Sequence, residues 1–394
     1  MNSAMIISAV RTPIGRFNGS FNSFSAPKLG SLVIAESLKR SGVSPEIVDE
    51  VIMGNVITAG LGQNPARQAS HYGGVPDKVP ALTINKVCGS GLKAIMIAAN
   101  SIKAGESQTI VAGGMENMTN APYILPSARF GQRLGHAELI DAMVYDGLWD
   151  IYNNFHMAIT AELVSEKYKV SREMQDAFAA KSHQKAVKAA KDGKFKDEML
   201  PVKIPAPKGK EPLTLDKDEG VREDTTAEKL GQLKPAFKEN GTVTAGNASQ
   251  ISDGASALLI MSSEKQEKMG INPMARIIDY AAGGLPPEWV MMAPVEAVKN
   301  LLQKTKMKIT DFDLIEINEA FSAAAVAVTS ELKANPEIVN IHGGAVALGH
   351  PIGCSGARIL TTLIYALKQR NLKKGLATLC LGGGNAVAIA IELI

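Results

Sequence analysis

The chain has 394 residues, enough for two or three domains, and its 45% hydrophobic and 21% charged residues are typical of a soluble globular protein. The net charge of +3 is too small to indicate nucleic-acid binding, no apolar run reaches the roughly 18 residues of a membrane span, and the N-terminus lacks the pattern of a signal peptide. Three cysteines exclude a disulfide framework, and no CxxC pair predicts a metal site, so we expect a cytoplasmic protein.

Short apolar runs and longer amphipathic stretches alternate from the N-terminus onward. MIISAV at 5–10, EVIMGNVI at 50–57 and TIVAGG at 109–114 predict buried strands. The stretches at 30–42 and 91–105 have helical periodicity and end in glycine. Buried strands that alternate with helices indicate an α/β fold, with a parallel or mixed sheet covered on both faces.

Segments of the last third of the chain resemble segments of the first. VDEVIMGNV, with Asn55, resembles FDLIEINEA, with Asn318, an offset of 263 residues (318 − 55). The helical stretch from Ser90 resembles the one from Ser355, an offset of 265 (355 − 90). Two similar offsets favour a duplicated α/β unit over a chance similarity.

The residue pattern changes between these repeats, at about 118 to 248, where mixed helices are predicted before the Pro/Lys-rich passage PVKIPAPKGKEPLT. We interpret this segment as an insertion, and insertions at strand ends commonly form substrate sites. Residues 181–210 contain nine lysines and three acidic residues. This run is either a solvated helix face or a basic rim that attracts a phosphorylated ligand.

The first cysteine, Cys88, lies in NKVCGSGLKA, between the apolar run ALTI and two glycines. The glycines predict a helix start, where free backbone N–H groups would stabilise a thiolate and receive a developing oxyanion. Most free cysteines are small buried hydrophobic residues, and this stretch alone leaves that alternative open.

Three further candidates lie in the C-terminal repeat. His350 is in a glycine-rich loop before a predicted helix, which favours function over a structural role. Cys380 precedes three glycines that allow backbone N–H groups to approach a ligand closely. Asn318 follows an apolar strand and either orients a water or an oxyanion or serves as a turn residue. We interpret Cys354 as a packing residue inside the helix start.

A weaker set lies in the insertion, where a cap, a turn or a solvated charge would explain each residue alone. It comprises the His156-Met157 pair, Arg222 and Ser249. The stretch NASQISDGAS, which contains Ser249, is predicted to open a small-residue helix and to anchor an anion or an amide.

Taken together, these motifs resemble those of the thiolase family over the whole chain. They are RTPIGRFNG (11–19), NKVCGSGLKA (85–94), GGMENMT (113–119), FHM (155–157), VREDTT (221–226), NASQISDG (247–254), NEAF (318–321), GGAVALGHPIGCSGAR (343–358) and CLGGGNA (380–386). The His156-Met157 pair resembles the short-chain biosynthetic type, which implies acetyl-CoA C-acetyltransferase activity: two acetyl-CoA condense to acetoacetyl-CoA and CoA.

The resemblance implies a role for each candidate. Cys88 would take the acetyl group as a thioester, and His350 would be the base it needs, since a thiol of pKa near 8.5 is mostly protonated at neutral pH. Cys380 would protonate the departing CoA and then deprotonate the methyl group of the second acetyl-CoA. His350 and a water held by Asn318 would form one oxyanion site, and the N–H groups of Cys88 and Gly382 a second.

The resemblance also implies the binding surface, the architecture and the assembly. The fold would be two duplicated α/β halves in five α-β-α-β-α layers, with an N-terminal domain at 1–118 and 249–270, an inserted CoA-binding loop domain at 119–248 and a C-terminal domain at 271–394. We expect CoA thioesters as substrates, no permanently bound cofactor or metal, no nucleic-acid or membrane partner, and a homotetramer built as a dimer of dimers. The positions that match the pantetheine and acyl channel are Leu148, His156, Met157, Phe237, Ala245, Ser249, Ala320 and Phe321, with Arg222 near the nucleotide end.

Two stretches depart from the family pattern near the expected channel, where they bear on chain-length preference. Gln250 and Ser252 stand where the family usually has glycine and asparagine, and the segment 286–297 lacks a usual glycine. The nearest alternative function is a degradative 3-ketoacyl-CoA thiolase of fatty-acid β-oxidation. A cysteine hydrolase with a Cys-His-Asn triad would leave Cys380 without a role, and a non-catalytic CoA-binding module would form no covalent adduct at Cys88.

Overall fold

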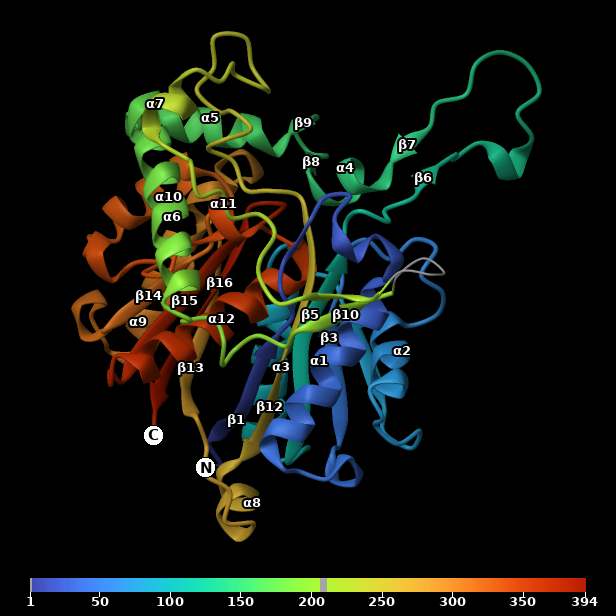
Figure 1. The fold of residues 1–394 in the computed structure, drawn as a ribbon, viewed down its shortest axis with the longest axis vertical. Coiled ribbons are helices and arrows are strands. Elements are labelled where there is room, and N and C mark those ends of the chain that lie inside the picture. The colour runs from blue at the N-terminus through green and yellow to red at the C-terminus, as the bar shows by residue number, and fades with distance from the viewer. Residues whose placement is uncertain (1, 206–210) are drawn as a thin grey trace.

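The computed structural model describes residues 2–205 and 211–394, and its centre is a ten-stranded mixed sheet (Figure 1). The strand order is β14-β15-β16-β13-β1-β12-β5-β3-β4, with β2 paired to β12. The strands are β1 (Ala4–Arg11), β2 (Gly15–Arg16), β3 (Glu50–Gly54), β4 (Ala81–Ile84), β5 (Thr109–Asn117), β12 (Ser252–Ser262), β13 (Ala275–Gly284), β14 (Leu314–Ile317), β15 (Lys374–Leu381) and β16 (Asn385–Leu393).

The two halves of this sheet have the same internal arrangement. In the first half, β3 is parallel to β5, β5 is antiparallel to β12, and β12 is antiparallel to β1. In the second half, β14 is parallel to β15, β15 is antiparallel to β16, and β16 is antiparallel to β13. The halves meet where β1 and β13 pair over Met5 and Ile6. The duplication expected from the two sequence offsets is therefore visible as one topology used twice.

Helices cover both halves and fill the space between them. The central hydrophobic cluster joins α3 and α12 to strands of both halves, whereas α1 and α2 cover the outer face of the first half and α9 and α10 that of the second. This confirms the expected five α-β-α-β-α layers. The helices are α1 (Ala26–Ser41), α2 (Pro65–Tyr72), α3 (Ser90–Ala104), α8 (Ser263–Lys268), α9 (Ala293–Thr305), α10 (Ser322–Glu331), α11 (Ala345–Leu348) and α12 (Ile352–Gln369).

Local signals explain where the layer helices begin and end. The Ser25 hydroxyl accepts a hydrogen bond from the Lys28 N–H at the start of α1, and Gly42 ends that helix in the left-handed conformation, at φ 68°. Gly105 ends α3 in the same way, at φ 82°. A residue with a Cβ would be strained at both glycines, so the predicted glycine stops are correct.

The segment between β5 and β12 adds a helical layer and a projecting loop, which extends from β6 and β7 away from the rest of the chain (Figure 1). Lys208, Lys210 and part of the Pro/Lys-rich passage lie outside the described residues. None of the helices in the described parts of the chain is both long and apolar enough to cross a membrane. The helices of the segment between β5 and β12 are α4 (Ala142–Gly147), α5 (Met157–Tyr168), α6 (Arg172–Lys191) and α7 (Ala227–Gly231). Its strand pairs are β6 (Tyr123–Ile124) with β7 (Ile140–Asp141), β8 (Trp149–Asp150) with β9 (Phe155–His156), and β10 (Val202–Ile204) with β11 (Leu213–Leu215).

One predicted element has the wrong type. NASQISDGAS was expected to open a helix, but the chain from Ser252 onward forms β12, which lies between β1 and β5. All eleven residues of β12 are buried, so the strand has no alternation of polar and apolar residues that would distinguish it from a buried helix. Smaller differences are that β3 ends at Gly54 and that α1 starts at Ala26.

Candidate active site

Cys88 lies in the tight connection between β4 and α3. Val87, just before it, has φ 46°, a conformation that is costly for a β-branched residue. Three hydrogen bonds hold this turn: the Val87 N–H donates to Asn85 Oδ1 (2.9 Å), the Ser90 hydroxyl to Val87 O (2.6 Å), and the Lys86 N–H to Ser90 Oγ (2.8 Å). The turn places Cys88 two residues before the first residue of α3, as predicted.

The surroundings of the Cys88 sulfur favour the neutral thiol at rest. Burial among apolar groups raises the pKa of Cys88 most, and Cys380 raises that pKa further. The backbone N–H groups of Cys88 and Gly382 act in the opposite direction. The two cysteines therefore lie close enough to influence each other, and two amides are available to a negative charge that develops beside Cys88.

His350 is buried in the loop that joins α11 to α12. Gly349, before it, has φ 111°, and a Cβ there would lie 2.3 Å from Ser252 Oγ, so the loop requires glycine at this position. The His350 N–H contacts both Gln250 O (3.1 Å) and Ser252 Oγ (3.2 Å). Gln250 and Ser252, the two departures from the family pattern, thus brace the histidine loop.

The two ring nitrogens of His350 have different partners. The Ser355 hydroxyl donates to Pro351 O (2.9 Å), so its oxygen accepts a hydrogen bond from the His350 Nδ1–H at 2.6 Å. His350 Nε2 lies 3.4 Å from Asn318 Nδ2. This arrangement leaves the lone pair on Nε2. Burial, with a smaller contribution from Arg358, lowers the pKa of His350 to about 3, so the ring is an uncharged proton acceptor near neutral pH.

Asn318 follows β14 and is joined to β15 because its N–H donates to Thr378 O (3.1 Å). Its side-chain Oδ1 is buried without a hydrogen-bond partner among the described residues. A buried amide oxygen without a partner costs free energy unless a water or a ligand binds it. Asn318 is thus placed beside His350 with an acceptor still available.

Cys380 is the second-last residue of β15, and burial raises the pKa of its thiol to about 12. Its sulfur lies 3.8 Å from the Met291 sulfur. Gly383 and Gly384 follow at φ 81° and 83°, and a Cβ on Gly384 would lie 2.2 Å from Leu285 O. These glycines make the turn into β16 that leaves the Gly382 N–H free to face Cys88.

A cavity of about 530 Å³, here called the site cavity, opens beside His350. The His156 and Phe237 rings stack in it at 4.7 Å, and burial lowers the pKa of His156. Seven of the nine residues expected to bind CoA line it: Leu148, His156, Arg222, Phe237, Ala245, Ser249 and Phe321.

The other two expected binding residues lie outside the lining of the site cavity. Met157 lines a neighbouring cavity of about 390 Å³, together with Val87 and Gly382. Ala320 is buried, and its carbonyl accepts a hydrogen bond from the Ser249 N–H (3.0 Å). Ala320 thus supports the lining residue Ser249 through its backbone.

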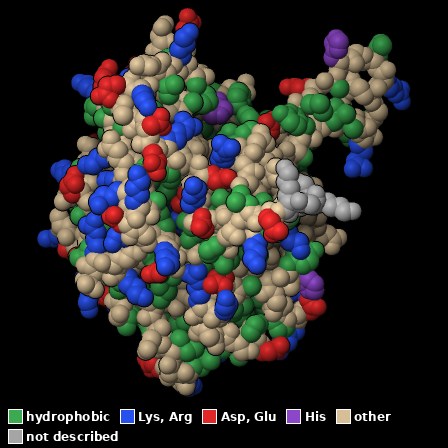
Figure 2. Space-filling view, in the orientation of Figure 1, with side chains coloured by type: hydrophobic (Ala, Val, Ile, Leu, Met, Phe, Trp, Pro, Cys, Tyr) green, Lys and Arg blue, Asp and Glu red, His purple; other side chains and the backbone are tan. Residues whose placement is uncertain are grey.

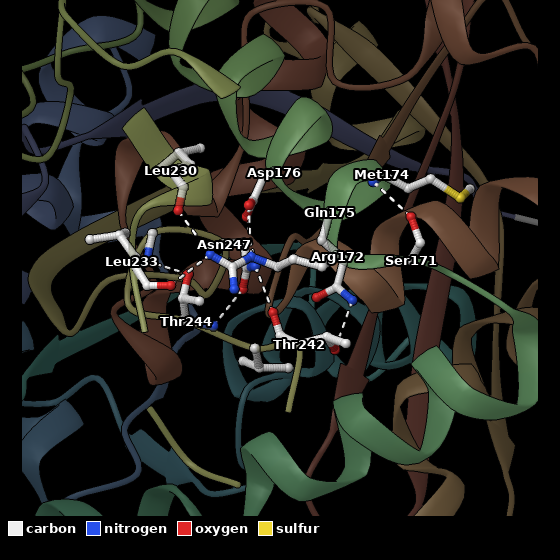
Figure 3. Close-up of polar contacts among 12 residues, drawn as sticks. Ser171, Arg172, Met174, Gln175, Asp176, Leu230, Leu233, Thr242, Thr244 and Asn247 are labelled. Atoms are coloured by element: carbon white, nitrogen blue, oxygen red, sulfur yellow. Dashed lines mark hydrogen bonds and ion pairs between the residues drawn. The ribbon is translucent and has the colours of Figure 1, made fainter. Parts of the chain in front are cut away.

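A polar cluster on α6 fixes the loop that carries Ser249 and Phe237 (Figure 3). Asn247 Nδ2 donates to Asp176 Oδ1 (2.9 Å) and to Thr242 O (3.0 Å). Arg172 on the same helix donates to Leu230 O and Leu233 O, both at 2.8 Å. One wall of the site cavity is therefore bonded to α6 rather than free to move alone.

Several contributing residues were not predicted from the sequence. Ser355 and Ser252 hold His350. Two buried carboxylates accept hydrogen bonds from the helices on either side of His350: Glu319 from the Val346 N–H in α11, and Glu116 from the Gly353 N–H in α12. The available signal was the repeat itself, because Ser355 matches Ser90, which holds the Cys88 turn. Among the described residues, no group of three or more His, Cys, Asp or Glu side chains is arranged to hold a metal ion.

Comparison with known proteins identifies the class of this fold and site. The model of the thiolase N-terminal domain matches residues 4–264, and that of the thiolase C-terminal domain matches residues 271–393. The chain therefore belongs to the thiolase family, whose members are acyltransferases.

Full-length relatives are named as acetyl-CoA acetyltransferases or, in Staphylococcus aureus at 50% identity, as a probable acetyl-CoA acyltransferase. The acetyl-CoA acetyltransferase of Cupriavidus necator is 53% identical over 392 residues, covering 100% of both chains. That of Pseudomonas aeruginosa is 52% identical and covers 99% of each. The crystal structure of the Bacillus anthracis acetyl-CoA acetyltransferase has a TM-score of 0.98 at 45% identity and covers 100% of this chain and 99% of its own.

Proposed function

We propose that this chain is an acetyl-CoA C-acetyltransferase that joins two acetyl-CoA molecules through an acetyl-Cys88 thioester. The observation that supports it most is that the loops of Cys88 and Cys380 meet, because Val87 and Gly382 line one cavity. His350 lines the site cavity, with its Nε2 lone pair directed toward Asn318. The names of the full-length relatives support the acetyl-specific reaction over the degradative one.

The first half-reaction transfers the acetyl group to the enzyme. His350 Nε2 takes the Cys88 proton while the sulfur attacks the acetyl carbonyl, and the N–H groups of Cys88 and Gly382 receive the negative oxygen. The bond from the carbonyl carbon to the CoA sulfur then breaks. The Cys380 thiol, which its raised pKa keeps protonated, gives its proton to the departing CoA thiolate.

The second half-reaction forms the carbon–carbon bond. The Cys380 thiolate removes a proton from the methyl group of a second acetyl-CoA, and His350 with a water on Asn318 stabilises the enolate oxygen. The enolate carbon attacks the acetyl-Cys88 carbonyl, the carbon–sulfur bond breaks, and Cys88 recovers its proton from His350. No permanently bound cofactor is needed, because side chains supply every acid, base and nucleophile.

The binding surface, the domains and the assembly are part of the proposal. CoA would lie in the site cavity against the inserted segment 119–248, with Arg222 toward its nucleotide end. Three cysteines without disulfides are in keeping with the cytoplasm. Exposed apolar side chains on the projecting loop, and the free edge of β4, support a homotetramer built as a dimer of dimers.

Mass spectrometry of the intact protein after mixing with acetyl-CoA tests the proposal. We expect one acetyl group on Cys88 in the unmodified chain and in Cys380→Ser, but acetoacetyl-CoA from the unmodified chain alone. Cys354→Ser is the matched control, because Cys354 is equally buried but contacts none of the proposed groups, and it should keep its turnover.

Two results would contradict the proposal. The absence of an adduct at Cys88 would indicate a non-catalytic module, and full turnover by Cys380→Ser would indicate a hydrolase. The degradative alternative is tested by comparing cleavage of acetoacetyl-CoA with that of 3-ketohexadecanoyl-CoA, and a clear preference for the long substrate would favour it.

A further inference from the structure

A third cavity, of about 320 Å³, lies between α6 and α10, and we call it the lysine-rimmed cavity. Phe178, Lys181, Ser182 and Lys185 line it from one face of α6, and Val326, Thr329 and Lys333 line it from α10 and its end. None of these residues lines the site cavity. A ligand here would therefore occupy a place separate from that of the CoA thioesters.

The lining combines apolar walls with a cationic rim. Phe178, Val326 and Val339 supply carbon surface, and Lys181, Lys185 and Lys333 lie around them. Figure 2 shows that Lys and Arg side chains gather on the side of the molecule where Figure 1 places α6 and α10. A pocket near 300 Å³ with few polar groups suits a small molecule whose tail is apolar and whose head binds the polar rim.

The charges around this cavity favour an anionic head. Burial lowers the pKa of Lys185, and among the described residues its ammonium group donates only to a neutral acceptor, Val339 O, at 2.9 Å. Lys181 pairs with Glu337 at 2.9 Å, but both side chains are more than half exposed, so this pair is weak and exchangeable. The carboxylate of Glu319, at the floor, already accepts three hydrogen bonds. A ligand carboxylate between the lysines would stabilise the Lys185 cation.

A residue at the floor of the lysine-rimmed cavity also holds segments that carry the candidate active site. Glu319 accepts hydrogen bonds from Ser182 Oγ (2.7 Å), Asn340 Nδ2 (2.9 Å) and the Val346 N–H (3.1 Å). Glu319 follows Asn318 in the chain, and Val346 is in α11, which leads to His350. A ligand seated on Ser182 and Glu319 would therefore alter the 3.4 Å contact between Asn318 and His350.

We propose that the lysine-rimmed cavity binds a small carboxylate with a hydrocarbon tail, and that the bound carboxylate slows acetyl transfer without competing with acetyl-CoA. The kinetic part rests on the function proposed above. The binding part does not, because it is measured on the protein without substrate.

Octanoate is the probe, with calorimetry on the full chain. We expect Lys333→Glu, an exposed substitution at the rim, and Val326→Trp, which fills the cavity, each to weaken octanoate binding about tenfold or more. Lys188→Glu makes the same charge change on α6 but away from the lining, so it should leave binding unchanged. Octan-1-ol, which lacks the charge, should bind at least about tenfold more weakly than octanoate.

The kinetic arm measures acetoacetyl-CoA formation at rising octanoate. We expect kcat to fall, KM for acetyl-CoA to stay constant, and Lys333→Glu to relieve the inhibition. Three outcomes would overturn the proposal: no octanoate binding, equal binding by Lys333→Glu and the unmodified chain, or displacement of octanoate by acetyl-CoA, which would place the carboxylate in the site cavity. If the acetyl adduct at Cys88 failed to form while octanoate bound as expected, the proposed function alone would fall.

Discussion

The tautomer of His350 depends on a single hydroxyl group. The Ser355 oxygen accepts a hydrogen bond from the Nδ1–H, because its own proton is donated to Pro351 O, and this keeps the proton on Nδ1 and leaves Nε2 unprotonated. Since the ring is buried, no bulk water can replace that acceptor. A ring free to exchange tautomers would spend part of its time with Nε2 protonated and unable to act as a base.

Ser355→Ala should therefore lower kcat, by about tenfold or more but by less than the roughly 10⁴-fold upper limit for a general base. Ser355→Thr, which keeps the hydroxyl, should restore part of the rate. Steady-state acetoacetyl-CoA formation measures both variants. The single-turnover rate of Cys88 acetylation shows whether the loss lies in the step in which His350 acts as the base or in a later step. Equal rates for Ser355→Ala and the unmodified chain would show that Nδ1 needs no fixed acceptor.

Burial of His350 also sets a pH dependence of stability. The folded-state pKa of about 3 lies below the usual value of 6.5, so the unfolded chain binds the proton more readily. Folding therefore becomes less favourable as the pH falls below 6.5, by up to about 1.4 kcal/mol per pH unit for this one group, until the pH approaches 3.

His350→Asn should flatten this dependence. Urea unfolding between pH 7 and 4.5 should show a smaller loss of stability in the variant than in the unmodified chain. Burial also lowers the pKa values of His183 and His342 to about 4, which leaves a slope of the same sign in the variant, whereas the raised pKa values of Glu116 and Asp253 act in the opposite direction in both proteins. An identical slope in both proteins would mean that His350 accepts a proton in the folded state as easily as in the unfolded one.

The end of β5 joins the two repeats through one carboxylate. Glu116 accepts hydrogen bonds from Asn55 Nδ2 (2.7 Å) and the Val56 N–H (3.0 Å) after β3, and from the Gly353 N–H (2.9 Å) at the start of α12. Burial raises the pKa of Glu116 to about 7, and these donors partly offset that rise. The same group thus ties the strand of the first repeat to the helix that follows His350.

Glu116→Ala should destabilise the fold by about 3 kcal/mol or more, because it leaves several buried donors without an acceptor. Glu46→Ala is a control of the same chemistry at the surface, where the pair with Lys78 is more than 60% exposed and worth less than about 1 kcal/mol. Urea midpoints with a common slope measure both. Similar urea midpoints for the two variants would show that Glu116 does not join the two repeats.

The features that the sequence predicted depend on local signals, whereas those that it missed depend on contacts between residues far apart in the chain. Cys88, His350, Cys380 and Asn318 can be proposed from the sequence because each stands inside a local glycine or strand signal. Glu116 was missed because its donors lie about 60 and 237 residues away, and only folding brings them together. The type of β12 was wrong for a related reason: two neighbouring strands, rather than its own residues, decide its conformation.

At the level of the assembly, two surfaces of the single chain have exposed features that favour association with other copies. The projecting loop carries Phe130 and Leu134, which are 83% and 96% exposed. At one end of the sheet, β4 has a free edge, and Leu82 on it is 41% exposed. Both features are unfavourable in an isolated chain, because exposed apolar side chains and free strand edges promote association.

We therefore expect the two surfaces to make different contacts within a tetramer. Replacing residues 126–138 with a short Gly-Ser linker keeps the β6–β7 pairing of Tyr123 with Asp141 and removes Phe130 and Leu134. That variant should sediment as a dimer, whereas Leu82→Lys, which puts a charge on the β4 edge, should weaken the contact within each dimer. Since none of these residues lines the site cavity, acetylation of Cys88 should persist in the shortened chain. A shortened chain that sediments with the mass of the unmodified assembly would exclude the projecting loop as a contact, and a monomeric unmodified chain would exclude both surfaces.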